Sequence, residues 1–165
     1  MKYYLIGYMY SGKSTFGPKL ASAKGLGFVD LDQAFEAKYH YEVARFFEVF
    51  GEEAFRKLEA RMLHATAAMD DVVISTGGGT PCHGDNMDFI LAHGTAIYLQ
   101  TPVDALVERA LRSRHVRPRL HGLPEAEMRA AIAAELAERE PIYLRAPIIL
   151  DGKVPSVEGV KLMSS

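Results

Sequence analysis

The stretch "GYMYSGKST" at residues 7–15 constrains the fold of this chain more than any other feature. Glycine stands at its first and sixth positions, and lysine and serine follow the second glycine, which is the pattern of a phosphate-binding loop. Such a loop joins a buried strand to a helix. Here the apolar run Tyr3–Ile6 precedes it, and Ser14–Lys24 reads as a helix that ends at Gly25. The motif therefore predicts an α/β protein that holds a nucleotide phosphate.

The members of this loop have separate expected tasks. Backbone N–H groups and the positive end of the following helix attract phosphate oxygens. Lys13 is expected to reach the β- and γ-phosphates, and the Ser14 hydroxyl to bind Mg²⁺. Tyr10 is bulky where such loops often have a small residue, so its side chain is expected to point away from the nucleotide. The alternative is a glycine-rich strand–helix turn that matches the pattern by chance.

Short apolar runs alternate with longer helical segments along the rest of the chain. The expected strands are Tyr3–Ile6, Phe28–Val29, Val72–Ile74, Thr95–Leu99 and Ile148–Leu150. The expected helices are Ser14–Lys24, a long region broken at Gly51 and continuing over Glu52–Met69, Pro102–Arg112, Pro124–Leu144 with a disturbance at Pro141, and Val157–Leu162. Five strands with helical crossovers predict a parallel sheet covered on both faces. No repeat or linker divides the chain, so residues 1–165 are expected to form one domain.

Composition narrows the possible partners and compartments. The 165 residues carry a net charge of −2, which argues against a nucleic-acid-binding protein. The single cysteine, Cys82, permits no internal disulfide and fits a reducing compartment. No signal-peptide pattern opens the chain, and no apolar run approaches the roughly 20 residues of a membrane span. We expect a soluble, cytoplasmic monomer with no membrane partner. A metal site at Cys82 and His83 is weakly supported, because no second Cys/His pair follows at a suitable spacing.

Two aspartates follow the second expected strand. Alternation along an extended chain would place Asp30 and Asp32 on the same side of the backbone, at the carboxyl edge of the sheet, where ligands of α/β proteins bind. One carboxylate could then assist Mg²⁺, while the other orients or deprotonates an attacking hydroxyl. The alternative is that Asp32 merely caps the next helix.

Three consecutive glycines, Gly77, Gly78 and Gly79, end the third expected strand. Many phosphate-loop enzymes carry an acidic residue at this place. Without side chains, the glycines allow a small ligand to approach the main chain closely. The alternative is a flexible turn without a ligand.

Arg56, Arg117 and Arg139 are candidates for binding a carboxylate or a phosphate, because the guanidinium group binds both in a planar, bidentate way. Any one of them could instead form a solvated surface ion pair. Glu52 and Glu59 lie at helical spacing from Arg56 and favour that simpler interpretation. Arg117 lies in the polar, basic stretch "HVRPRLHG", which reads as a mobile surface loop.

Taken in order, these segments resemble the shikimate kinase family over nearly the whole chain. The matching series is "GYMYSGKST", "FVDLDQAFE", "FFEVFGEEAFRKLE", "VVISTGGGT", "VRPRL" and "EREPIYLRA". The resemblance implies a three-layer α/β/α fold of the nucleoside-monophosphate-kinase type. It also implies a mobile lid at about 112–124 and a substrate-binding helical region at about 32–61. The implied reaction transfers the γ-phosphoryl group of ATP to the 3-hydroxyl of shikimate, on the chorismate route to the aromatic amino acids.

The resemblance also implies the role of each site residue. The ATP phosphates would be held by Tyr10, Ser11, Gly12, Lys13, Ser14 and Thr15, together with Arg117 of the lid. Mg²⁺ would be held by Ser14 and Asp30. Shikimate would be bound by Asp32, Arg56, Gly77, Gly78, Gly79 and Arg139. Catalysis would depend on Asp32 as the base and on Lys13 and Arg117. A loop around Gly152–Ser156 would flank the adenine, and Arg119 stands where the family usually has leucine.

Two other functions stay open on the sequence alone. A kinase of the same fold could act on another small hydroxy acid such as gluconate, or on a nucleotide. A nucleotide-binding switch without metabolic turnover is the second alternative, although the chain has no Asn-Lys-x-Asp pattern for guanine recognition.

Overall fold

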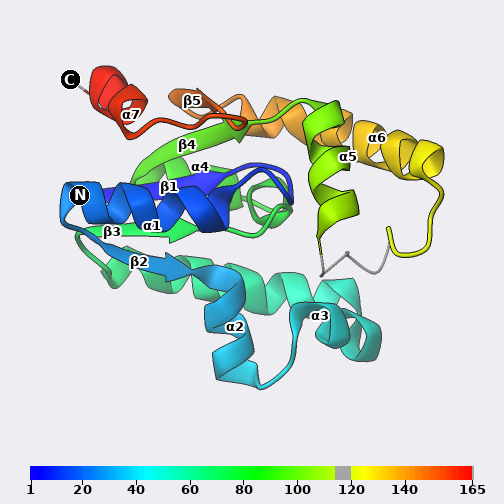
Figure 1. Ribbon diagram of the computed structural model, residues 1–165. Coiled ribbons are helices and arrows are strands. Elements are labelled where there is room, and N and C mark those ends of the chain that lie inside the picture. The colour runs from blue at the N-terminus through cyan, green and yellow to red at the C-terminus, as the bar shows by residue number, and fades with distance from the viewer. Residues whose placement is uncertain (114–119, 165) are drawn as a thin grey trace.

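A five-stranded parallel sheet forms the centre of the molecule in the computed structural model, which describes residues 1–113 and 120–164 (Figure 1). Its strands are β1 (Lys2–Ile6), β2 (Gly27–Asp30), β3 (Val72–Ser75), β4 (Thr95–Gln100) and β5 (Ile148–Asp151). They lie in the order β2-β3-β1-β4-β5, and every neighbouring pair is parallel. The predicted sheet is thereby confirmed.

The register brings the ends of three strands to one level. Ser75 of β3 is the partner of both Leu5 in β1 and Asp30 in β2. The residues that follow these positions therefore emerge side by side from the carboxyl edge of the sheet. They include the phosphate loop after β1, the helix start after Asp30 and the glycines after Ser75. The sequence motifs thus share one edge because the strands are parallel and in step.

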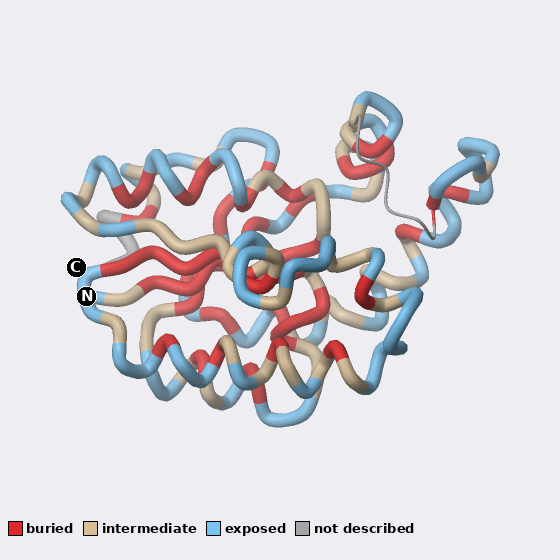
Figure 2. The backbone as a smooth tube through the Cα atoms, turned by 90° about the horizontal axis from the view of Figure 1, so that it is seen from below, coloured by how far each residue is buried: buried red, intermediate tan, exposed pale blue. Residues whose placement is uncertain are grey.

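Helices cover both faces of the sheet, giving the three layers that were expected. The helices are α1 (Lys13–Lys24), α2 (Leu31–Tyr39), α3 (Val43–Ala65), α4 (Asn86–His93), α5 (Val103–Arg112), α6 (Glu125–Tyr143) and α7 (Val157–Ser164). Alternate residues of β1 face opposite layers. Tyr3 and Leu5 join the core beneath α1 and α7, whereas Tyr4 and Ile6 join the core beneath α3, α4 and α6. Figure 2 shows the buried strands enclosed between helices whose outer sides are exposed.

The helical region between β2 and β3 is broken where the sequence predicts it. Gly51 has φ 86° and ψ 167°, which interrupts α3 where the sequence predicted a break. Before this break, Phe46 is buried in an aromatic cluster, whereas Phe50 is 49% exposed. At the other end of the chain, α6 continues through Pro141 to Tyr143, so the predicted disturbance there is not observed.

The structure describes both ends of the predicted lid. Helix α5 ends at Arg112, and Leu120 is buried in the larger core. Arg117 and Arg119 lie outside the described residues. Among the described helices, none combines the length and apolar character that a membrane span requires.

Candidate active site

The phosphate loop folds tightly around its lysine. Lys13 is buried, and its Nζ donates to the carbonyl oxygens of Gly7 at 2.6 Å and Tyr8 at 3.0 Å. Gly12, with φ 99°, starts helix α1, and its carbonyl accepts the N–H groups of Thr15 and Phe16. The N-terminal end of α1 thereby opens into a cavity of about 1500 Å³ that all residues from Tyr10 to Phe16 line. The helix start therefore lies where the sequence predicts the phosphate loop, and a helix N-terminus attracts anions.

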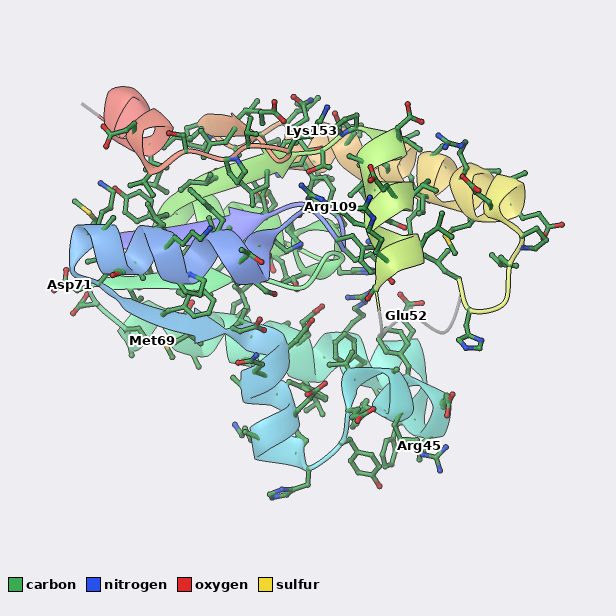
Figure 3. All side chains as sticks on the ribbon, viewed as in Figure 1. Arg45, Glu52, Met69, Asp71, Arg109 and Lys153 are labelled. Atoms are coloured by element: carbon green, nitrogen blue, oxygen red, sulfur yellow. The ribbon has the colours of Figure 1, made fainter. Side chains whose placement is uncertain are left out.

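Tyr10 takes an unusual backbone conformation, with φ 69°. Its carbonyl accepts from Arg109 Nη1 at 2.9 Å, while Arg109 Nη2 donates to Gly152 O at 2.8 Å. Arg109 from α5 thus joins the phosphate loop to the loop after β5, beside Lys153 (Figure 3). The Tyr10 side chain packs against the larger core. The sequence analysis missed Arg109, because nothing in its spacing separates it from neighbouring surface arginines.

The two aspartates lie where they were expected but for a different structural reason. Asp30 ends β2 and caps α2, since its Oδ1 accepts from the N–H groups of Asp32 at 2.9 Å and Gln33 at 3.2 Å. Asp32 belongs to the first turn of α2. The prediction that strand alternation sets both carboxylates is therefore wrong, and so is the alternative that Asp32 is the cap. Helix α2 begins at Leu31, two residues earlier than a cap at Asp32 would place it, and Asp30 provides its cap.

A second cavity of about 420 Å³ adjoins the first. Arg56 of α3 faces it, and only 17% of this side chain is exposed. The guanidinium lies over the neighbouring rings of Phe47 and Phe55, with its carbon 5.5 and 5.2 Å from their centroids. Its Nη1 donates to Glu59 Oε1 at 2.9 Å, and its Nε to Glu52 Oε1 at 3.4 Å. The ion pairs suggested by helical spacing do form, but they hold Arg56 toward the cavity instead of toward solvent.

Glu59 is a buried carboxylate that the sequence analysis treated only as a neighbour of Arg56. One oxygen accepts from Arg56, and the other accepts from Thr80 Oγ1 at 2.8 Å. Because Thr80 directly follows the three glycines, Glu59 connects helix α3 to the glycine turn. Helical spacing indicated the pairing with Arg56. No pattern in the sequence indicated that the pair would be buried.

The three glycines lie in close contact with functional side chains. A Cβ atom at Gly79 would stand 2.7 Å from Arg56 Nη2, and one at Gly77 would stand 3.1 Å from Asp32 Oδ1. At Gly78 the nearest atom would be the backbone nitrogen of Met9, at 3.1 Å. The glycine turn is therefore packed between the phosphate loop and the arginine. This close approach favours the binding interpretation of the glycines over a flexible turn.

Arg139 of α6 also lines the second cavity. Only 14% of its side chain is exposed. One turn later, the Tyr143 hydroxyl donates to the carbonyl of Gly78 at 2.5 Å. Burial raises the pKa of Tyr143 well above its ordinary value, so the phenol stays protonated as a donor. Helix α6 therefore supplies both an arginine to the cavity and a hydrogen bond to its glycine wall.

Cys82 and His83 lie beside these arginines. Burial lowers the pKa of His83, with a further contribution from the positive charge of Arg56, and burial raises the pKa of the Cys82 thiol. Both side chains therefore favour their neutral forms. Within residues 1–113 and 120–164, no three His, Cys, Asp or Glu side chains group closely enough to hold a metal ion. The described part of the chain gives the Cys-His metal interpretation no support.

The two cavities share one wall. The residues that line both are Met9, Asp32, Val43, Ala44, Gly77 and Gly78. The phosphate loop lines the larger cavity, and the two largely buried arginines line the smaller one. Asp32 is the ionisable side chain among the shared residues. Its carboxylate therefore borders both cavities.

Comparison with known proteins gives this arrangement a family. The family model described as shikimate kinase matches residues 9–159. The chain belongs to the shikimate kinase family. A shikimate kinase from Parabacteroides distasonis is 47% identical over 150 residues, covering 91% of this chain and 87% of the relative. The recognition made from the motifs is confirmed.

Solved structures agree with this membership. The crystal structure of shikimate kinase from Bacteroides thetaiotaomicron matches with a TM-score of 0.90 at 35% identity, over 99% of this chain and 93% of that one. The shikimate kinase from Acinetobacter baumannii in complex with shikimate matches with a TM-score of 0.82 at 29% identity, over 99% and 88% of the two chains. The chain is a shikimate kinase enzyme of the shikimate and chorismate pathway, and the family implies that it uses ATP. The other-acceptor and switch alternatives receive no such support.

Proposed function

We propose that this chain transfers the γ-phosphoryl group of ATP to the 3-hydroxyl of shikimate, with the residues of the two cavities in distinct roles. One observation supports this assignment most directly: Asp32 lines both the cavity of the phosphate loop and the cavity of the arginines. An acceptor hydroxyl in the smaller cavity would meet a phosphoryl group from the larger one beside this carboxylate. Asp32 orients the hydroxyl and accepts its proton.

Arg56 and Arg139 bind the carboxylate of the acceptor. They enter the smaller cavity from α3 and α6, and both are mostly buried. Guanidinium groups with little solvent contact bind a carboxylate strongly and hold it in one orientation. Gly77, Gly78 and Gly79 present backbone to the ring of the acceptor, since side chains there would collide with their neighbours. The acceptor is thereby fixed with a hydroxyl toward Asp32.

The phosphate side rests on Tyr10, Ser11, Gly12, Lys13, Ser14 and Thr15. Lys13 and the backbone N–H groups neutralise and orient the transferred group, which is most of what phosphoryl transfer needs. Arg117, outside the described residues, would add a positive charge from the lid. The loop at 152–155 lines the same cavity and is positioned to flank the adenine.

Ser14 and Asp30 fit a Mg²⁺ ion that accompanies ATP. Both line the larger cavity, Ser14 is exposed at the first turn of α1, and Asp30 stands at the carboxyl edge of the sheet. Mg²⁺ keeps several waters and takes one or two protein oxygens plus phosphates, so it needs no dense cluster of side chains. When bound, the ion would neutralise charge on the phosphates. Because Asp30 Oδ1 already caps α2, its contact with the ion is expected through water.

Domain and assembly assignments complete the proposal. Residues 1–165 act as one P-loop kinase domain, with a substrate-binding helical region at about 32–61 and a lid at about 112–124. Both cavities are lined within one chain, so a monomer carries a whole site. Lid closure would exclude water and limit wasteful hydrolysis of ATP.

Phosphorus NMR of the reaction product tests the proposed chemistry. With ATP, Mg²⁺ and shikimate, a single phosphate monoester coupled to the proton on carbon 3 is expected. Chelation of Mg²⁺ should abolish its formation. Asp32→Asn should slow single turnover on the order of 100-fold or more while the fold is retained. An ester at another hydroxyl, or an unchanged rate in Asp32→Asn, would contradict the proposal.

A further inference from the structure

A tyrosine of the phosphate loop reaches across to the acceptor side of the molecule. Tyr8 follows Gly7 directly and is 2% exposed. Its hydroxyl donates to Glu135 Oε1, on α6, at 2.8 Å. The contact spans 127 positions of the sequence and joins the loop after β1 to the helix that carries Arg139. None of the roles assigned above uses the side chain of either residue.

The second oxygen of Glu135 faces the acceptor arginine. Glu135 Oε2 lies 3.7 Å from Arg139 Nη2, one helical turn away, and the two side chains are only 17% and 14% exposed. Arg139 also lies over the ring of Tyr8, with its guanidinium carbon 5.7 Å from the ring centroid. Tyr8 therefore contacts Arg139 directly through its ring. Its hydroxyl is also connected to Arg139 through the carboxylate of Glu135. A guanidinium held by a carboxylate and an aromatic face has few alternative rotamers left.

The backbone of Tyr8 belongs to the nucleotide site. Its carbonyl accepts from Lys13 Nζ at 3.0 Å. One residue thus contacts the lysine expected at the phosphates and, through its side chain, the arginine expected at the acceptor carboxylate. Tyr8 thereby connects the two charged groups.

We propose that Tyr8 and Glu135 are positioning residues. They orient the Arg139 guanidinium for the acceptor carboxylate and hold it in a defined position relative to the phosphate loop. This inference rests on the proposed role of Arg139 in binding shikimate. A pre-oriented arginine loses less conformational entropy when the acceptor binds. Loss of the Tyr8–Glu135 hydrogen bond should therefore weaken acceptor binding and leave nucleotide binding largely intact.

Tyr8→Phe is the sharpest single change, because it keeps the ring over Arg139 and removes only the hydroxyl. We expect kcat/KM for shikimate to fall about three- to tenfold, with KM for ATP within about twofold of wild type. Glu135→Gln should act on the same parameter. Tyr4→Phe is the matched control: it removes a buried hydroxyl from β1, the strand that precedes the phosphate loop, where it is hydrogen-bonded to Thr66 at 2.6 Å and lies away from both cavities. It should leave kcat/KM for shikimate unchanged.

A double-mutant cycle distinguishes two roles of the Tyr8 hydroxyl: positioning Arg139, or only attaching helix α6 to the phosphate loop. Rates at low shikimate give kcat/KM for wild type, Tyr8→Phe, Arg139→Lys and the double variant. If Tyr8 acts through Arg139, the Tyr8→Phe loss disappears in the Arg139→Lys background. A loss of equal size in both backgrounds overturns the inference, as does wild-type behaviour of Tyr8→Phe. If Arg139→Lys itself leaves kcat/KM for shikimate unchanged, the proposed acceptor role of Arg139 fails instead.

Discussion

Glu59 shows how much of this site depends on single buried residues. Its two carboxylate oxygens serve Arg56 and Thr80, and the residue is 6% exposed. Hydrogen bonds to a charged group with little solvent contact are stronger than neutral ones. The residue therefore has both a structural and a functional role, because the group it orients is the proposed carboxylate ligand.

Replacing Glu59 should separate these two roles. Glu59→Gln keeps the shape of the side chain but loses the charge opposite Arg56. We expect the free energy of unfolding to fall by about 1–3 kcal/mol, and KM for shikimate to rise more than KM for ATP. Urea denaturation and steady-state kinetics measure the two effects. Equal changes in both KM values would show that Glu59 does not act through the acceptor site.

Gly79 provides a purely steric test of the same wall. Its φ of −90° and ψ of −10° suit alanine, so Gly79→Ala introduces no backbone strain. The added Cβ would stand 2.7 Å from Arg56 Nη2 and must displace that arginine. We expect a loss of kcat/KM for shikimate on the order of 10- to 100-fold. Gly27→Ala is the control, since its Cβ would stand 3.8 Å from Asp71 O, an ordinary van der Waals contact. Equal losses in both variants would contradict the steric explanation.

The lowered pKa of His83 predicts how folding stability changes with pH. Its pKa in the folded protein lies below the ordinary value of 6.5, mainly because of burial and then because of Arg56. Below about pH 6.5 the unfolded chain therefore binds more protons at this residue than the folded chain, so folding stability decreases as the pH falls. Denaturation between about pH 7 and about pH 5 should show a shallower loss of stability in His83→Gln than in wild type. A steeper loss of folding stability in His83→Gln than in wild type would contradict the assigned direction of the pKa shift.

At the scale of the element, α6 combines three connections in one turn of helix. Arg139 faces the smaller cavity, Glu140 accepts from the hydroxyl of Tyr98 on β4, and Tyr143 donates to Gly78 O. The helix is thus fixed to the sheet at Glu140 and to the glycine turn at Tyr143. Its arginine directly precedes the first of these attachments. The motif "EREPIY" therefore acts as one structural unit in addition to supplying a ligand.

The two tyrosines should have different effects when their hydroxyls are removed. Tyr143→Phe frees the Gly78 carbonyl in the wall of both cavities. We expect KM for shikimate to rise about three- to tenfold. Tyr98→Phe removes the attachment to Glu140, away from the cavities, and should lower the melting temperature while KM for shikimate stays near wild type. The reverse pattern, with Tyr98→Phe affecting KM and Tyr143→Phe only stability, would contradict this division.

At the scale of the whole molecule, the sequence predicted the architecture well. The phosphate loop and the alternating apolar runs sufficed for the five strands, and hence for the carboxyl edge where the motifs meet. The arrangement within the site was less accessible. Asp30 and Asp32 were misread because the exact start of α2 decides which aspartate is the cap. Tyr8, Glu135 and Arg109 were missed because their partners lie far away in the sequence.

Release of ADP in a coupled assay tests the central claim most directly. The enzyme is given ATP and Mg²⁺ with shikimate, with gluconate, with nucleoside monophosphates, or with no acceptor. The account predicts strong stimulation by shikimate alone, because the smaller cavity has two buried arginines for a carboxylate and Asp32 for a hydroxyl. ATP binding without stimulation by shikimate, or equal stimulation by gluconate, would leave the phosphate loop intact and contradict the assigned acceptor site.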